Sequence, residues 1–303
     1  MRVLFSIALA CTGVGGTLQA QATSELQQRA SQAWFDKDWA KAAEAYGALA
    51  GQTPNTALPH FRLGVSLINL GRAAEARSHL EAAERLGMPL PQVAFRLAQV
   101  AAAAGDKDAA FGHLKRATDA GLALVPLPLD TDPAFMRLKG DARLDLFLTA
   151  VDRNARPCRY DPKHAEFDFW LGDWEVRPRG QPSAPAASNV ITKIHDGCVV
   201  LESYSAPGYT GQSFNIYDRT RKQWNQTWVD KTGGLHVYWG VAREGNMYYE
   251  GEMPDPTAPG SRVKTRLTFF RMAADTVRQF SESTRDEGKS WTVNYDLLYT
   301  RKR

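Results

Sequence analysis

The sequence has little cysteine and no clustered charge. Three cysteines occur among 303 residues, and no His-x-x-x-His or Cys-x-x-Cys pair predicts a metal site. The formal net charge is only +4, and the longest basic run is the end Arg301-Lys302-Arg303, which does not suggest nucleic-acid binding. A Gly-x-Ser-x-Gly elbow and a glycine-rich phosphate loop are also missing. We therefore predict no metal, no cofactor and no catalytic residue.

Long hydrophobic runs are absent as well. No segment approaches the roughly 20 apolar residues that a membrane-spanning helix needs, so we expect no transmembrane segment. Residues 1–22 have the pattern of an export signal: Arg2, then an apolar stretch, then Ala20-Gln21-Ala22 as the cleavage site. A lipoprotein anchor at Cys11 is a weaker interpretation, because Cys11 comes early and Ala8 fits its motif poorly. The sequence predicts a periplasmic or secreted protein, cleaved near Ala22.

Export changes the interpretation of the two cysteines that remain after cleavage. Cys158 and Cys198 form an even count in an oxidising compartment, where disulfides persist. A bridge between them would tie the entry of the C-terminal half to one of its early strands. The alternative is a pair of free, buried thiols.

Residues 23–122 contain an internal repeat with a period of 34 residues. A shift by one period aligns Phe61-Arg62-Leu63-Gly64 with Phe95-Arg96-Leu97-Ala98. The same shift superposes further pairs: Gly71 on Gly105, Ala76 on Ala110, Leu80 on Leu114, Ala83 on Ala117 and Gly87 on Gly121. This pattern resembles tetratricopeptide (TPR) repeats, which stack pairs of helices into a superhelix and bind a peptide or protein partner. We predict an all-α domain over residues 23–152, with C-terminal capping helices after the repeats.

Residues 153–166 read as a polar linker, and the pattern then changes to strands separated by turns. Turn signals such as Asp196-Gly197 and Gly233-Gly234 recur mostly at intervals of roughly 8–15 residues, which predicts an antiparallel meander. We expect nine or ten strands over residues 167–303. On the last strand, Trp291, Val293, Tyr295, Leu297 and Tyr299 alternate onto one face. A sheet with one apolar face must close or pair with a second sheet.

The ordered motifs of this half resemble the lipocalin (calycin) superfamily. Gly172-x-Trp174 opens the first strand, and Arg301 ends the last one. The match over residues 158–303 is closer to an uncharacterised family of bacterial secreted proteins with a lipocalin-like domain. Its motifs are Phe167-Asp168-Phe169-Trp170-Leu171-Gly172-Asp173-Trp174, Gly197-Cys198, Gly211-x-Ser213-x-Asn215-x-Tyr217-Asp218, Trp224-x-Gln226-x-Trp228-Val229-Asp230, Arg278-Gln279-Phe280 and Gly288-Lys289-Ser290-Trp291. The resemblance implies an antiparallel β-barrel in which Gly172, Trp174 and Arg301 plug the closed end.

Several strand positions are polar where a plain barrel core would be apolar. They are Glu202, Ser213, Asn215, Gln226 and Trp228. If these side chains point inward, they line a ligand pocket with aromatic walls. If they point to water, then Phe214, Ile216 and Val229 point inward. The alternation of side chains along a strand does not by itself decide which face is the inner one.

The functional hypotheses follow from this two-domain organisation. The leading one is an exported, non-catalytic protein whose barrel binds a small, partly apolar ligand while the repeats dock a protein partner. The second is a structural envelope protein with a barrel filled by side chains. The third is an enzyme acting inside the barrel, which a buried carboxylate or histidine with a shifted pKa would favour. Haem binding through His195 or His236 has no supporting local motif.

Overall fold

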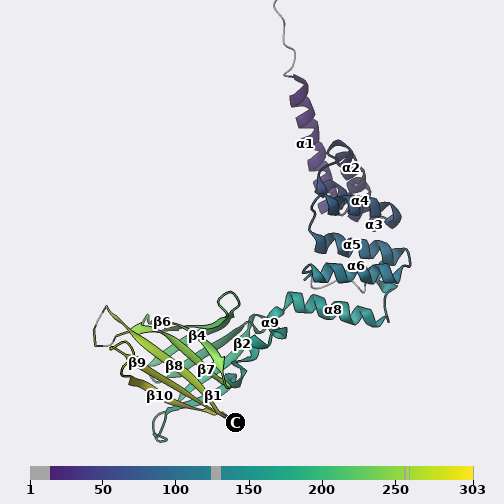
Figure 1. Cartoon of the computed structure of the whole chain (residues 1–303). Coiled ribbons are helices and arrows are strands. Elements are labelled where there is room, and N and C mark those ends of the chain that lie inside the picture. The colour runs from purple at the N-terminus through teal and green to yellow at the C-terminus, as the bar shows by residue number, and fades with distance from the viewer. Residues whose placement is uncertain (1–13, 124–130, 256, 259, 303) are drawn as a thin grey trace, which may run out of the picture. The chain divides into compact units, whose positions relative to one another are not determined.

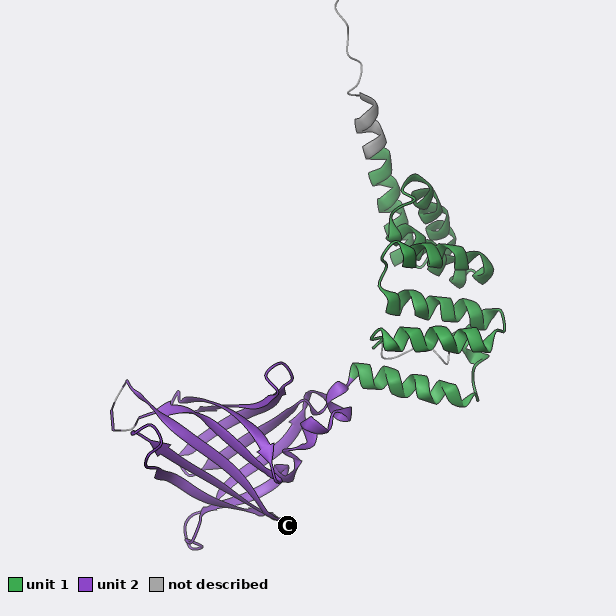
Figure 2. Cartoon of the chain, in the orientation of Figure 1, with its two compact units in different colours: residues 1–155 green, residues 156–303 purple. Residues whose placement is uncertain are grey.

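A computed structural model describes residues 14–123, 131–255, 257–258 and 260–302. The chain divides into two compact units, residues 1–155 and residues 156–303 (Figure 2). The start of the export signal and Cys11 lie outside the described residues. Within the described residues, no helix is both long enough and apolar enough to span a bilayer.

The first unit is built from helices arranged mainly as antiparallel pairs (Figure 1). The paired helices are α1 (Val14–Phe35) with α2 (Trp39–Gln52), α3 (Ala57–Asn69) with α4 (Ala73–Arg85), and α5 (Leu90–Ala103) with α6 (Lys107–Asp119). The short α7 (Pro133–Met136) and α8 (Ala142–Ala155) follow them. Asp132 caps α7, since its carboxylate accepts a hydrogen bond from the Ala134 amide at 2.8 Å.

The 34-residue period is visible in how the helices begin and end. Gly71 and Gly105 follow α3 and α5 with φ of +74° and +82°, the left-handed conformation that ends a helix and that glycine adopts without strain. The amide of Arg72 bonds the carbonyl of Leu67 at 2.8 Å, and one period later Asp106 bonds Ala101 at 3.0 Å. The repeat in the sequence is therefore a repeat in backbone conformation.

The side chains that pack between helices also recur with the 34-residue period. Ala76, Leu80 and Ala83 of α4 are fully buried, and so are their counterparts in α6, Ala110, Leu114 and Ala117. Gly64 of α3 lies where an added Cβ would come within 2.8 Å of Leu80. A small residue there lets the paired helices approach closely.

The second unit is a closed antiparallel barrel in which each strand pairs with the next and β1 pairs with β10 (Figure 1). Its strands are β1 (Gly172–Pro178), β2 (Ala187–Ile194), β3 (Val199–Ala206), β4 (Tyr209–Asp218), β5 (Gln223–Asp230), β6 (Leu235–Arg243), β7 (Asn246–Pro254), β8 (Arg262–Ala273), β9 (Thr276–Thr284) and β10 (Thr292–Arg301). Closure leaves no strand edge unpaired.

Two details differ from the sequence expectations. Residues 153–166 include the end of α8, the short α9 (Pro157–Tyr160) and the 3-10 turn η1 (Pro162–Ala165), so much of this stretch is helical. On β10, a register shift between Val293 and Tyr295 interrupts the alternation. Val293 is therefore 54% exposed and does not share the inner face with Tyr295, Leu297 and Tyr299.

Candidate functional site

Aromatic side chains fill one end of the barrel. The 3-10 turn η2 (Asp168–Trp170) comes just before β1, and Phe167 directly precedes it. Phe167 and Trp170 are fully buried. Trp170 packs on Phe269 at a ring separation of 4.5 Å, and Phe167 packs on both at 4.9 and 5.0 Å. The barrel interior at this end is a packed aromatic core.

The predicted plug residues meet at the same end. The Arg301 guanidinium lies over the Trp174 ring at 4.4 Å, and its Nη1 donates to the Leu171 carbonyl at 2.9 Å. The Trp174 indole donates to the Trp170 carbonyl at 2.7 Å. Gly172 has a φ of +126°, and an added Cβ there would lie 2.0 Å from the Arg301 guanidinium. The position therefore needs glycine for both its conformation and its space.

The predicted polar residues lie inside the barrel, above this core. Glu202, Ser213, Asn215 and Gln226 are all buried, whereas the alternate side chains Phe214, Ile216 and Val229 are 45%, 39% and 42% exposed. The strand register explains why the inward positions cluster, because Glu202 pairs with Ser213 and Asn215 pairs with Gln226 on adjacent strands. Cross-strand neighbours share one face of a sheet.

These side chains form one hydrogen-bonded network around Glu202. Its two carboxyl oxygens accept bonds from Asn189 Nδ2 and Ser213 Oγ, each at 2.6 Å. Asn215 Nδ2 donates to Ser213 at 2.9 Å, and Asn189 Nδ2 also donates to the Tyr299 hydroxyl at 3.2 Å. Both oxygens of the buried carboxyl are thus satisfied by neutral groups rather than by an ion pair.

Burial raises the pKa of Glu202 to about 7, because the low-dielectric interior penalises the charged form. The hydrogen bonds from Ser213 and Asn189 act in the opposite direction and only partly offset this desolvation. Glu202 is therefore a carboxyl group that changes charge near neutral pH inside the barrel.

We expect this buried carboxyl to make the barrel less stable as the pH rises. The folded-state pKa of about 7 exceeds the unfolded value of 4.5, so the folded state binds more protons between these values, and stability is lost as the pH rises from 4.5 through 7. A shift of that size corresponds to about 3 kcal/mol. Urea unfolding at pH 5 and pH 8 should show this loss in the native chain and not in Glu202→Gln.

The control for this prediction is Glu252→Gln, which removes an exposed carboxylate of β7 from the outer face. The stability of Glu252→Gln should depend on pH as that of the native chain does, because this variant keeps Glu202 and the other carboxyl groups. An equal pH dependence in Glu202→Gln and the native chain would contradict the raised pKa.

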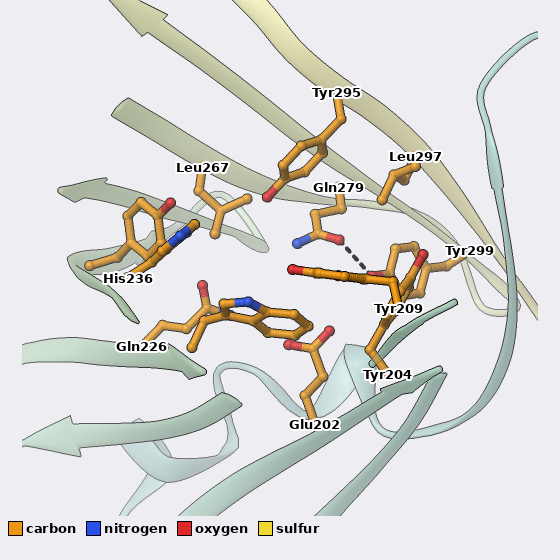
Figure 3. Close-up of a pocket in the computed structure, with 12 residues that line it drawn as sticks. Glu202, Tyr204, Tyr209, Gln226, His236, Leu267, Gln279, Tyr295, Leu297 and Tyr299 are labelled. Carbon is orange, nitrogen blue, oxygen red and sulfur yellow. Dashed lines mark hydrogen bonds between the residues drawn. The ribbon is translucent and has the colours of Figure 1, made fainter. Parts of the chain in front are cut away.

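A cavity of about 270 Å³ lies beside the network (Figure 3). It is lined by Glu202, Tyr204, Tyr209, Gln226, Trp228, His236, Tyr238, Leu267, Gln279, Tyr295, Leu297 and Tyr299. The carboxyl of Glu202 and the hydroxyl of Tyr295 point into the cavity (Figure 3). Tyr299 donates to Gln279 Oε1 at 2.5 Å, which orients the Gln279 amide in the cavity wall.

The cavity brings together only part of the predicted site. Glu202, Gln226 and Trp228 line it, whereas Ser213 and Asn215 lie in the hydrogen-bonded network around Glu202. Alternation on the last strand places Tyr295, Leu297 and Tyr299 on one face, and all three line the cavity. Apart from Trp228, the rest of the aromatic wall and Gln279 were not predicted as site residues.

The two histidines considered for metal or haem lie in different places. His236 lines the cavity, and burial lowers its pKa, which favours the neutral ring. His195 lies in the 3-10 turn η3 (His195–Gly197) between β2 and β3. Among the described residues, no group of three or more metal-ligating side chains comes together.

The predicted disulfide is confirmed. Cys158 of α9 and Cys198, which directly follows η3, are bonded, with their Cα atoms 5.0 Å apart. Beside the bridge, Arg159 Nη2 lies 2.9 Å from the carboxylate of Asp196. The bridge attaches the segment that precedes the plug to the turn between β2 and β3.

The chain thus consists of a helical repeat unit followed by a closed, ten-stranded antiparallel barrel. No protein-family model and no curated protein matches the sequence. One similar solved structure is the type III secretion translocator chaperone SycD of Yersinia enterocolitica: TM-score 0.32, 15% identity, covering 44% of this chain and 92% of that chain. Another is PcrH in complex with the chaperone-binding region of PopD: TM-score 0.33, 17% identity, covering 48% and 98%. Scores this low support no functional argument.

Proposed function

We propose that this protein is an exported binding protein whose barrel holds a small, partly apolar molecule. The observation that carries the proposal is the cavity of about 270 Å³, which has aromatic walls and a few convergent polar groups. Small-molecule sites in proteins usually have this make-up. The Cys158–Cys198 disulfide fits an oxidising compartment, which supports export.

Native mass spectrometry of the chain purified from an oxidising compartment tests this proposal. We expect extra mass that is lost on denaturation. Leu297→Trp, which places an indole in the cavity wall, should abolish the extra mass, whereas Leu298→Trp on the neighbouring, outward position should retain it. A bare mass, together with no rise in melting temperature with small aromatic test compounds, would contradict ligand binding and favour a structural barrel.

Catalysis is a second candidate, and Glu202 is the observation that favours it. A buried carboxyl that faces a cavity with a pKa raised to about 7 has the property of a general acid. Incubation of the recovered ligand with fresh protein distinguishes the two functions. Binding predicts an unchanged ligand, whereas catalysis predicts a converted ligand and loss of conversion in Glu202→Gln.

For the helical unit we propose docking of a protein partner. The support is the 34-residue repeat together with a groove of about 610 Å³ between α1 and α2, whose lining includes Arg29, Asp36, Lys41 and Glu44. Cross-linking in the native envelope should trap a partner, and Arg29→Glu should weaken the cross-link. Lys115→Glu on α6, outside this groove, is the matched control. Equal cross-linking in both variants would contradict docking at this groove.

A further inference from the structure

The carboxyl of Glu202 is the group in the cavity wall that can carry a negative charge. Among the described residues that line it, Glu202 is acidic and none is lysine, arginine or aspartate. His236 also lines the cavity, and burial lowers its pKa, which favours the neutral imidazole. Besides the Trp228 indole, the polar groups in the wall are thus a carboxyl, side-chain amides, tyrosine hydroxyls and an imidazole, each of which can accept a hydrogen bond.

Aromatic faces surround the same space. Trp228 is stacked on Tyr209 with 6.4 Å between ring centroids and an interplanar angle of 26°. Tyr204 meets Trp228 and Tyr209 edge-on at 6.1 and 6.3 Å. The negative faces of such rings attract a cation within about 6 Å of their centroids.

A second carboxylate holds this aromatic wall in place. Asp230 Oδ2 accepts hydrogen bonds from the Tyr209 hydroxyl at 3.0 Å and from the Trp228 indole at 3.3 Å. Hydrogen bonds from Thr232 and Gly234 hold the pKa of Asp230 well below its usual range, so Asp230 stays charged. Tyr209 is among the exposed aromatic residues, which places this negative charge beside the solvent-facing side of the cavity.

We propose that the ligand of the barrel is a small organic ammonium ion, a primary amine on an apolar or aromatic body, with its ammonium group on the Glu202 carboxylate. This inference rests on the proposed binding function and names the ligand class. The aromatic rings of Tyr204 and Trp228 pack around the cation, and Leu267 and Leu297 contact its apolar body.

The cavity volume limits the size of the amine. About 270 Å³ equals the liquid volume of roughly nine waters at ~30 Å³ each, which suits a molecule of on the order of ten non-hydrogen atoms. 2-Phenylethylamine has this size, and 2-phenylethanol and phenylacetate are its neutral and anionic counterparts.

This binding mode predicts that the affinity for the amine depends on pH. Below pH 7 the Glu202 carboxyl is protonated, and binding of an amine that is already an ammonium ion releases this proton to solvent. Affinity for the amine should therefore rise about tenfold per pH unit between pH 5 and pH 7, whereas affinity for the alcohol should stay constant. The ionisable groups that face Glu202 are Tyr204 on its own strand, Tyr249 on β7, and Tyr295 and Tyr299 on β10, and burial raises the pKa of all four.

His236 is the other group in the cavity wall that could add to this slope. Desolvation lowers its pKa below 6.5, with Asp230 and Arg262 acting on it in opposite directions. A protonated His236 would repel an ammonium ion and not the neutral alcohol. The part of the slope that is lost in Glu202→Gln, which keeps His236, therefore reports on Glu202.

Isothermal titration calorimetry of the full chain with the three probes at pH 5, 6, 7 and 8 tests the inference. We expect 2-phenylethylamine to bind at least about tenfold more tightly than 2-phenylethanol at pH 7, with phenylacetate weakest. Glu202→Gln should remove this preference and the pH slope while it retains the alcohol. Glu252→Gln, a matched loss of charge on the outer face, should leave both unchanged. A thermal melt at pH 5 checks that each variant is folded.

The outcomes separate this inference from the proposed function. If the alcohol or the carboxylate binds as tightly as the amine, or the preference survives in Glu202→Gln, the ammonium assignment is overturned while ligand binding stands. If none of the three probes binds to the folded chain, both the assignment and the binding of a ligand of this size are overturned.

Discussion

Trp174→Ala is expected to lower the free energy of unfolding of the barrel by about 4 kcal/mol, the usual cost of removing a large buried aromatic side chain. Trp174 is fully buried, and its indole bonds the Trp170 carbonyl at 2.7 Å. The substitution leaves this carbonyl without its donor and Arg301 without the ring that it covers at 4.4 Å. Urea unfolding followed by tryptophan fluorescence measures the loss, because six of the eight tryptophans lie beyond residue 156.

The matched control is Trp239→Ala. Trp239 lies on β6 with its ring on the outer face, where Arg221 covers it at 4.1 Å. Because this ring is only partly buried, we expect a clearly smaller loss of stability. Equal losses in the two variants, or a native melting temperature for Trp174→Ala, would show that Trp174 does not anchor the closed end.

The helical unit could be predicted from the sequence because its information is local. Many helices end at a residue with positive φ, and glycine recurs with the period at Gly71 and Gly105, which follow α3 and α5. Small residues must lie where paired helices touch, and alanine recurs at Ala76 and Ala110. Each requirement acts within one repeat, so aligning the repeats reveals it.

The barrel interior was harder to predict because parity leaves two arrangements open on every strand. Register across the sheet resolves them: Glu202 pairs with Ser213, Ser213 with Trp228, and Trp228 with His236. On these neighbouring strands Ser213 donates to Glu202 at 2.6 Å and the Trp228 indole donates to Asp230 at 3.3 Å, so these polar groups have hydrogen-bond partners inside the protein. A single strand read by itself does not contain this information.

The cavity itself could not be predicted from alternation. Its wall includes Tyr204, Tyr238 and Tyr295 from three strands that are far apart in the sequence, and its volume depends on how their rings pack. The shift at Val293 also changes which residues of β10 reach the interior. Such a bulge leaves no clear signal in the pattern of apolar residues.

Reduction of the Cys158–Cys198 disulfide is expected to lower the free energy of unfolding of the barrel by about 4 kcal/mol. The bridge closes a loop with a sequence separation of 40 residues. In the chain-entropy model, the bridge restricts the unfolded chain. Opening a loop of this length raises the conformational entropy of the unfolded state and so lowers its free energy by about that amount. The exposed ion pair of Arg159 with Asp196 beside the bridge cannot replace it, since exposed pairs contribute about 0–1 kcal/mol.

Urea unfolding with and without reductant measures this effect. Cys158 is buried and reacts slowly in the native state, so the samples are equilibrated at urea concentrations in the transition region, where the bridge becomes accessible to the reductant. The double variant Cys158→Ala, Cys198→Ala is the control: it should match the reduced protein in stability and show no response to reductant. Two titratable thiols in the native, oxidised protein, or equal stability with and without reductant, would contradict the prediction. A loss confined to the barrel transition would place the stabilisation at the segment that leads into the plug, so the bridge and Trp174 would hold the same end of the barrel.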